Sequence, residues 1–117
     1  MTLKTNKPEI IINEPTFFIL LSLASGPKHG YAVMKDTEEL SRGKVSLSTS
    51  TLYTALNRLL NQGLLERSDT GENGAGPGLP RKVYCLNERG RRILHAEAKR
   101  MQDMLASYQR RLGEEPT

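Results

Sequence analysis

The sequence predicts a mainly α-helical chain with a small β-hairpin, in which a long final helix follows the hairpin. Three observations carry this prediction. Apolar residues recur at helical spacing before residue 62 and again after residue 87. Between these stretches lie two short strand-like segments, 64–68 and 81–86, the second with Val83 and Tyr84. The segment that joins them, TGENGAGPGLP, has the glycine and proline content of a turn.

Length and composition are those of one soluble globular domain. The chain has 117 residues, of which 37% are hydrophobic and 26% charged. No apolar run is long enough to span a membrane, and we expect no signal peptide, because no basic segment precedes an apolar core at the start. Cys85 is the single cysteine, so we expect no internal disulfide and a reducing compartment such as the cytoplasm.

The first two helices are bounded by residues that cap or break helices. Residues 1–12 show no helical pattern and are expected to form a flexible N-terminal arm. Asn13 is a strong N-cap for the first helix, which should end at Gly26-Pro27. The second helix opens at His29-Gly30-Tyr31 and runs to about Leu40.

The third helix, 48–62, has two different faces. Ser48 is its N-cap and Gly63 stops it. The apolar stripe consists of Leu52, Leu56, Leu59 and Leu60. The opposite face carries Ser50, Thr54, Asn57, Arg58 and Asn61. Hydroxyls, amides and guanidinium groups hydrogen-bond base edges and phosphates, so we interpret this helix as the recognition helix of a DNA-binding protein. An ordinary surface helix has the same pattern.

A hairpin directly behind a recognition helix is a wing, so the predicted architecture is a winged helix-turn-helix. Arg81 and Lys82 lie at the base of this wing, where they can reach a sugar–phosphate backbone; a solvated basic pair is the alternative. The net charge is +4. Positive charge gathers in residues 41–67 and 87–112, which fits double-stranded DNA as partner.

The last helix, 87–112, carries an apolar seam at the coiled-coil period. Its length of about 37 Å, at 1.5 Å per residue, overshoots so small a domain. We therefore predict a dimerisation helix that pairs with a second copy; the alternative is that it folds over its own first helix. The seam residues are spaced 4, 3, 4, 3 and 4 apart: Leu94, Ala98, Met101, Leu105, Tyr108 and Leu112. Phe17 is expected at the same dimer interface.

Three motifs, HGYAVMKDTEEL, SLSTSTLYTALNRLLNQGLL and PRKVYCLNERGRRIL, resemble the signature of PadR-type bacterial transcriptional regulators over about residues 14–96. The single C-terminal helix is similar to the small-chain subfamily. The resemblance implies a homodimeric repressor, cytoplasmic and associated with the nucleoid when bound to an inverted-repeat operator. Many members release DNA when a small hydrophobic or aromatic compound binds at the dimer interface.

Carried over by position, the resemblance assigns DNA contacts to the second helix, the recognition helix and the wing. Arg58 is a candidate for guanine, and Asn57 or Asn61 for adenine. The full set of predicted DNA-binding residues is His29, Gly30, Tyr31, Ser48, Thr49, Ser50, Thr51, Tyr53, Thr54, Asn57, Arg58, Arg81 and Lys82. Core packing is the main role expected of Tyr53. The family often has Pro-Gly where this chain has Thr49-Ser50, and Thr where it has Asn87.

An effector would meet apolar and sulfur-containing side chains at the dimer interface. The candidates are Phe18, Met101, Met104 and Tyr108, with Phe17 beside them. The simpler alternative is that these side chains only fill the interface. No tryptophan is present to sandwich a planar ligand.

Other function classes find less support. No catalytic constellation, metal-ligand spacing or phosphate-cradling glycine motif occurs, so we expect no enzyme, metal or cofactor. A winged-helix protein-interaction module without specific DNA binding remains the alternative function. The predicted division is an arm at 1–12, a DNA-binding domain at 13–86, and a dimerisation helix with a short tail at 87–117.

Overall fold

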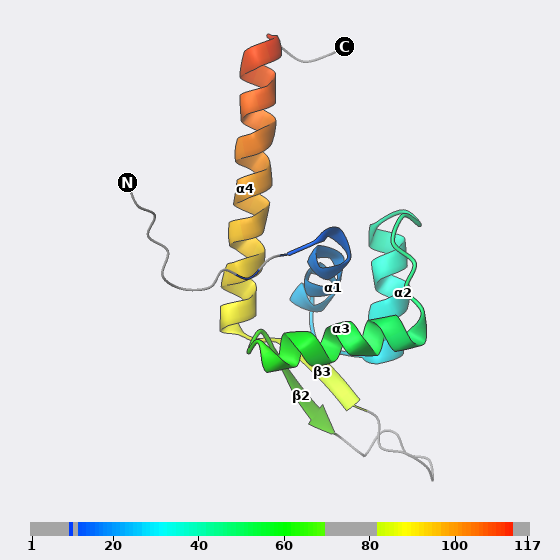
Figure 1. Cartoon of the computed structure of the whole chain (residues 1–117). Helices are drawn as coiled ribbons and strands as arrows, with labels where there is room; N and C mark the ends of the chain where they lie inside the picture. Colours follow the sequence, from blue (N-terminus) through cyan, green and yellow to red (C-terminus); the bar gives the residue numbers. More distant parts are fainter. Residues whose placement is uncertain (1–9, 11, 70–81, 114–117) are drawn as a thin grey trace.

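The computed structural model describes residues 10, 12–69 and 82–113. The predicted fold class is confirmed, with helices and a small antiparallel sheet followed by a long C-terminal helix that projects away from the rest (Figure 1). The elements in order are α1 (Glu14–Ala24), β1 (Lys28–His29), α2 (Gly30–Leu40), α3 (Thr49–Asn61), β2 (Leu65–Asp69), β3 (Lys82–Leu86) and α4 (Glu88–Leu112). Most of the predicted arm, the hairpin tip with Arg81, and residues 114–117 lie outside the described residues.

The predicted N-caps are confirmed at three helices. The side-chain oxygen of Asn13 accepts a hydrogen bond from the backbone N–H of Thr16 at 2.9 Å. Ser48 caps α3 through the N–H of Thr51 at 3.1 Å. Asn87 caps α4 in the same way. Each cap satisfies one of the free N–H groups of a first helical turn and fixes where the helix begins.

The end of α3 sets the direction in which the chain enters the sheet. Gly63 has a φ of 77°, which favours glycine. The N–H of Leu64 donates to the carbonyl of Leu59 at 3.0 Å, and that of Gly63 to Leu60 at 3.0 Å. These two bonds form a Schellman motif, and its apolar pair, Leu59 and Leu64, is fully buried. The end of α3 is therefore anchored directly to β2.

The sheet has three strands in the order β1-β3-β2, all antiparallel. The sequence predicted only the hairpin of β2 and β3. The prediction missed β1 because a strand of two residues is too short to show a period of two. In β1, His29 is paired with Val83. Its ring Nδ1 also lies 3.3 Å from the carbonyl oxygen of Lys82. This strand joins the start of α2 to the base of the wing.

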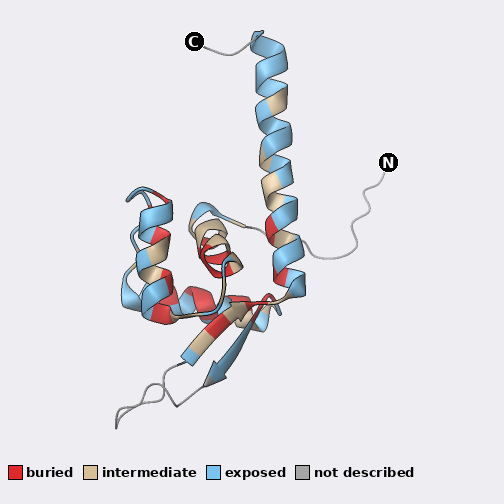
Figure 2. Cartoon of the chain, turned by 180° about the vertical axis from the view of Figure 1, so that it is seen from behind, coloured by how far each residue is buried: buried red, intermediate tan, exposed pale blue. Residues whose placement is uncertain are grey.

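The core lies where α1, α3 and the sheet meet (Figure 2). The predicted stripe of α3 supplies three fully buried residues, Leu52, Leu56 and Leu59, whereas Leu60 is half-buried. Burial of each leucine contributes roughly 1.5–3 kcal/mol, so the apolar stripe holds α3 in the core and turns its polar face outward. Ile10 and Ile12, from the predicted arm, are half-buried against this core.

Replacing Thr37 with valine is expected to stabilise the protein. Thr37 is fully buried in α2, and its hydroxyl has no hydrogen-bond partner among the described residues. A buried unsatisfied hydroxyl costs about 1–3 kcal/mol, and valine has the same shape without that group. Urea denaturation should show a free energy of unfolding about 1 kcal/mol higher for Thr37→Val. The exposed Thr54→Val serves as control, and an unchanged or lower stability of Thr37→Val would contradict the expectation.

Candidate nucleic-acid interface

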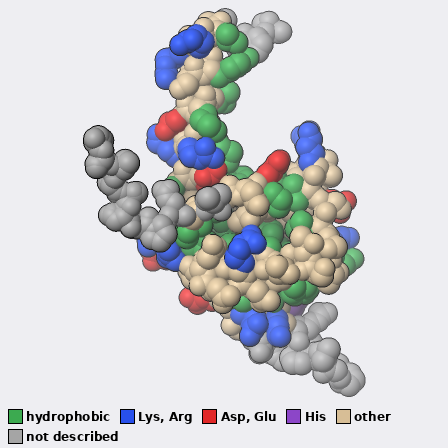
Figure 3. Space-filling model, in the orientation of Figure 1, with side chains coloured by type: hydrophobic (Ala, Val, Ile, Leu, Met, Phe, Trp, Pro, Cys, Tyr) green, Lys and Arg blue, Asp and Glu red, His purple; other side chains and the backbone are tan. Residues whose placement is uncertain are grey.

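The outward face of α3 is a stripe of uncharged polar side chains. Because successive residues of a helix are rotated by about 100°, this stripe stands opposite the buried leucines. Its members are Ser50, Thr54, Asn57 and Asn61, and all four are exposed. The sequence of α3 contains no Asp or Glu. In Figure 3 the surface over α3 is mostly uncharged, whereas basic side chains gather along α4 and beside the wing. The face offers hydrogen-bond donors and acceptors without repelling a polyanion.

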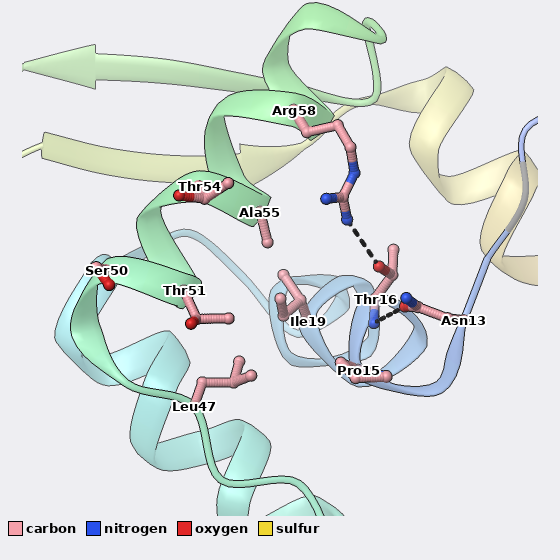
Figure 4. A pocket seen from close by; sticks show the side chains of 10 residues that line it. All are labelled: Asn13, Pro15, Thr16, Ile19, Leu47, Ser50, Thr51, Thr54, Ala55 and Arg58. Atoms are coloured by element: carbon pink, nitrogen blue, oxygen red, sulfur yellow. Dashed lines mark hydrogen bonds between the residues drawn. The ribbon is translucent and has the colours of Figure 1, made fainter.

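Arg58 lies on the flank of α3 that faces α1, rather than at the centre of the outward face. Its Nη2 donates a hydrogen bond to the hydroxyl oxygen of Thr16 at 3.1 Å (Figure 4). The sequence predicted a guanine contact for Arg58, and the structure shows its guanidinium directed toward α1. Helical spacing places a residue on a face but does not determine which way a long side chain bends.

A cleft of about 290 Å³ separates the first turn of α1 from α3 (Figure 4). Arg58 is the one charged residue among the described residues that line it, and hydroxyl groups line much of the rest. The lining residues are Asn13, Pro15, Thr16, Ile19, Leu47, Ser50, Thr51, Thr54, Ala55 and Arg58. The sequence did not predict the contribution of α1, because it arises from a tertiary contact between segments about 40 residues apart, which no local pattern signals. It also did not predict that Leu47, just before α3, lines the same cleft.

Tyr53 lies on the other flank of α3, where it meets the start of α2. A Cβ atom on Gly30 would clash with the hydroxyl end of the Tyr53 ring, so any side chain at position 30 requires the phenol to move. The ring also lies 6.4 Å from that of Tyr84. Tyr53 is nevertheless 37% exposed, more than a role in core packing alone predicts. Gly30 and Tyr53, from two separate sequence motifs, thus lie directly against each other.

Replacing Gly30 with alanine is expected to destabilise the protein by about 1–3 kcal/mol, because Tyr53 must move. In a Tyr53→Ala background the same change should cost little, because the three atoms nearest to a Cβ at position 30 all belong to Tyr53. Urea denaturation of the wild type, the two single variants and the double variant gives the coupling free energy between positions 30 and 53. Additive effects would show that the phenol is not what excludes a side chain at position 30.

The start of α2 and the base of the wing lie together. His29 is the N-cap of α2 but makes no side-chain capping bond, so the first-turn N–H groups receive no help from it. Tyr31 is 64% exposed, and the ammonium of Lys35 lies 5.9 Å from its ring centroid. Lys82, at the start of β3, is exposed beside His29. Three segments predicted to contact DNA, residues 29–31, α3 and Lys82, are therefore joined by direct contacts. Arg81 lies outside the described residues.

The first turns of α4 belong to the core, in contrast to the prediction for its seam. Leu94, expected at the dimer interface, is 7% exposed and is part of the core of its own chain. Phe17, also expected there, is half-buried against the core and meets Phe18 edge to face at 5.7 Å. The periodicity of α4 is continuous, so the sequence does not mark where packing within the chain ends.

Beyond Met101, α4 presents an apolar seam to solvent. Its large side chains are between 50% and 60% exposed: Met104, Leu105, Tyr108 and Leu112. Ala98 and Met101, between the core and this part, are half-buried. Hydrophobic side chains follow one side of α4 in Figure 3. The radius of gyration, 17.2 Å, exceeds the value of about 13 Å for a compact chain of this length, as a projecting helix requires.

The rest of α4 carries ion pairs at helical spacing. Arg100 donates hydrogen bonds to the carboxylate of Glu97, which lowers the pKa of Glu97 and raises the pKa of Arg100. Lys99 and Asp103 approach to 3.1 Å. Such exposed pairs support the helix modestly and leave its apolar seam uncovered.

The described parts of the chain meet neither the requirements of a metal-binding cluster nor those of a membrane-spanning helix. They contain no group of three or more His, Cys, Asp or Glu side chains able to hold a metal ion. None of their helices combines the length and apolarity needed to cross a bilayer.

Comparison with known proteins matches this chain to one family model and to a longer relative. The model of the transcriptional regulator PadR-like family matches residues 19–96. An uncharacterized 37.1 kDa protein in transposon TN4556 of Streptomyces fradiae is 34% identical over 89 residues, a match that covers 76% of this chain and 23% of that protein. The chain therefore spans about a quarter of the length of this relative.

Among solved structures, a PadR family regulator from Clostridium difficile R20291 has a TM-score of 0.69 at 23% identity, covering 86% of this chain and 100% of that one. A PadR family regulator from Eggerthella lenta has a TM-score of 0.64 at 25% identity, covering 87% of each chain. Bacillus subtilis PadR in complex with operator DNA has a TM-score of 0.62 at 27% identity, covering 70% of this chain and 45% of that one. This chain belongs to the PadR-like family of transcriptional regulators.

Proposed function

We propose that two copies of this chain form a repressor that binds an inverted-repeat operator. The observation that carries the proposal is the outward face of α3, which presents exposed hydroxyls and amides without a carboxylate. In the proposed complex this face enters the major groove, where each base pair displays a distinct set of donors and acceptors. The crystallised complex of Bacillus subtilis PadR with operator DNA supports the assignment.

In this proposal the amide side chains of α3 contact the bases directly. Asn57 and Asn61 are exposed, lie one helical turn apart and point away from the core. An Asn side chain can pair with the N6 and N7 atoms of adenine through two hydrogen bonds, and a good pair of this kind is worth about 1–3 kcal/mol of discrimination. Ser50, Thr51 and Thr54 supply hydroxyls for phosphates or bases near the start of the helix.

In this proposal the first turn of α2 and the wing contact the sugar–phosphate backbone. The first-turn N–H groups of α2 lack a side-chain cap, so a phosphate can accept hydrogen bonds from them. Lys82 adds a positive charge beside His29, at the base of the proposed wing, 64–86. These contacts carry no sequence information, but they fix how the protein sits on the duplex.

The second copy binds along α4. The exposed part of its seam, from Met104 to Leu112, is apolar, and its large side chains are at least half exposed in the described chain. Pairing two such seams places two recognition helices about a two-fold axis, and successive major grooves on one side of DNA recur about every 34–36 Å. In this proposal residues 13–86 form the DNA-binding domain and residues 87–117 the dimerisation segment.

The same proposed interface offers apolar side chains that bind a small hydrophobic or aromatic effector, which releases the protein from DNA. Met104 and Tyr108 are each 50% exposed and lie one turn apart on α4. Methionine adapts its shape to varied apolar ligands. Addition of planar aromatic compounds to the protein–DNA complex tests this part of the proposal. Release that disappears in Met104→Ala supports it, and equal release by wild type and variant contradicts it.

Selection of bound sequences from a random duplex library tests the proposed function. We expect an inverted repeat whose half-sites are centred about 10 base pairs, or a multiple, apart. Asn57→Ala should lose discrimination at one position of each half-site by about 5- to 150-fold, and Ser107→Ala, an exposed change on α4, should bind as wild type. Enrichment of no sequence would contradict DNA regulation and favour a winged-helix module that binds another protein.

A further inference from the structure

The contact between Arg58 and Thr16 joins the recognition helix to the first turn of α1. Thr16 is 3% exposed, and its hydroxyl oxygen accepts the Arg58 hydrogen bond at 3.1 Å. Its backbone N–H donates to Asn13, which holds the residue in place from the other side. The three residues form a chain in Figure 4, with Arg58 bent from α3 toward α1. A long, exposed side chain is thus held by a fixed, buried partner.

The partner of this guanidinium is neutral. No described Asp or Glu lines the cleft around it, and none of the ion pairs found in this part of the chain includes Arg58. One hydrogen bond to a hydroxyl and a guanine contact in the major groove are of comparable strength. Arg58 can therefore exchange one for the other at small cost.

The cleft gives the guanidinium room to leave. Its volume of about 290 Å³ is sufficient for water to reach the Thr16 hydroxyl after Arg58 departs. The residues on the α3 side are small or hydroxyl-bearing: Ser50, Thr51, Thr54 and Ala55. A swing of Arg58 toward the outward face would pass these short side chains.

We propose that Thr16 is a positioning residue that tunes DNA sequence preference by competing with a base for the Arg58 guanidinium. In the free protein Arg58 rests on Thr16. At a site with guanine within reach it transfers to the base, and at other sites it stays on Thr16. The binding free energy gained from the guanine contact is thereby reduced by the loss of the hydrogen bond between Arg58 and Thr16. This inference rests on the proposed function.

The test compares two substitutions at position 16, each alone and combined with Arg58→Ala. Thr16→Val removes the hydroxyl and keeps the shape, whereas Thr16→Ser keeps the hydroxyl and is the matched control. Random-library selection and equilibrium constants on the selected duplexes, at one salt concentration, give the preference at each base pair. Arg58→Ala should lose a guanine preference at one position of each half-site. Thr16→Val should sharpen that preference roughly fivefold, with Thr16→Ser close to wild type.

The double variant shows whether Thr16 changes the base preference through Arg58. In the Arg58→Ala background, Thr16→Val should change no base preference, because the competing side chain is absent. Without DNA, Thr16→Val should shift the Nε–Hε NMR resonance of Arg58 and leave that of the exposed Arg92 in place. An unchanged preference in Thr16→Val, or the same change with and without Arg58, overturns the inference.

Failure of the inference and failure of the proposed function give different results. If Arg58→Ala keeps every base preference while Asn57→Ala loses one, DNA regulation stands and the role of Thr16 is overturned. If wild type selects no sequence, both are overturned.

Discussion

Replacing Leu105 with glutamate is expected to yield a monomer whose affinity for the selected inverted repeat is at least about 100-fold lower. Leu105 is 54% exposed in the middle of the α4 seam, and a carboxylate there would be buried without a partner in a dimer. A monomer binds one half-site at a time and loses the effective concentration that links the two, typically worth 10²–10⁴ in affinity.

Sedimentation equilibrium and DNA titration measure the two parts of this expectation. Ser107→Glu introduces the same charge on the opposite side of α4 and serves as control, because Ser107 is exposed and outside the seam. It should remain dimeric and bind DNA nearly as wild type. A dimeric Leu105→Glu protein with unchanged affinity would show that the seam is not the interface.

Replacing Gly90 with alanine is expected to lower the free energy of unfolding by about 3 kcal/mol or more. A Cβ at position 90 would stand 2.3 Å from the backbone oxygen of Leu64 and 2.8 Å from Cδ1 of Leu86. The backbone oxygen cannot turn aside as a side-chain end can, because the N–H of Asn87 donates to it at 3.2 Å. The first turn of α4 must therefore shift off the junction between α3 and β2.

Urea denaturation measures the loss for Gly90→Ala, and Arg91→Ala, an exposed change in the same turn, is the control. The control should stay within about 0.5 kcal/mol of wild type. Alanine is intrinsically the better helix former, so a stabilised Gly90→Ala protein would show that the close approach of α4 to Leu64 does not exist in solution. The position matters beyond stability, because this approach sets the direction in which α4 leaves the core.

The features predicted well from the sequence are those determined by neighbouring residues. Asn13, Ser48 and Asn87 cap their helices through bonds to residues three positions away, and such bonds follow from local sequence alone. The buried leucines of α3 follow from the helical period for the same reason. Thr49 and Ser50 are both exposed in the first turn of α3, and the Ser48 cap forms beside them.

The features missed depend on contacts between distant segments. β1 exists because Lys28–His29 lies beside β3, and its two residues show no pattern of their own. Leu94 fits the seam of α4 perfectly in spacing, yet it is buried in the core because α4 starts against the sheet. The direction of Arg58 depends on Thr16, 42 positions earlier in the sequence, and only the packing of α1 on α3 reveals it.

The most direct test of the account is the salt dependence of binding to the selected duplex and to a scrambled duplex, for wild type and Lys82→Ala, with Lys99→Ala as the charge-matched control on α4. Wild type should prefer the selected duplex by about 10³-fold or more and lose affinity for both steeply as salt rises. Lys82→Ala should weaken binding to both duplexes about equally and reduce the salt slope by about 1 for each subunit, whereas Lys99→Ala should change neither. Equal affinity for the two duplexes at every salt concentration would contradict the claim that α3 reads DNA sequence.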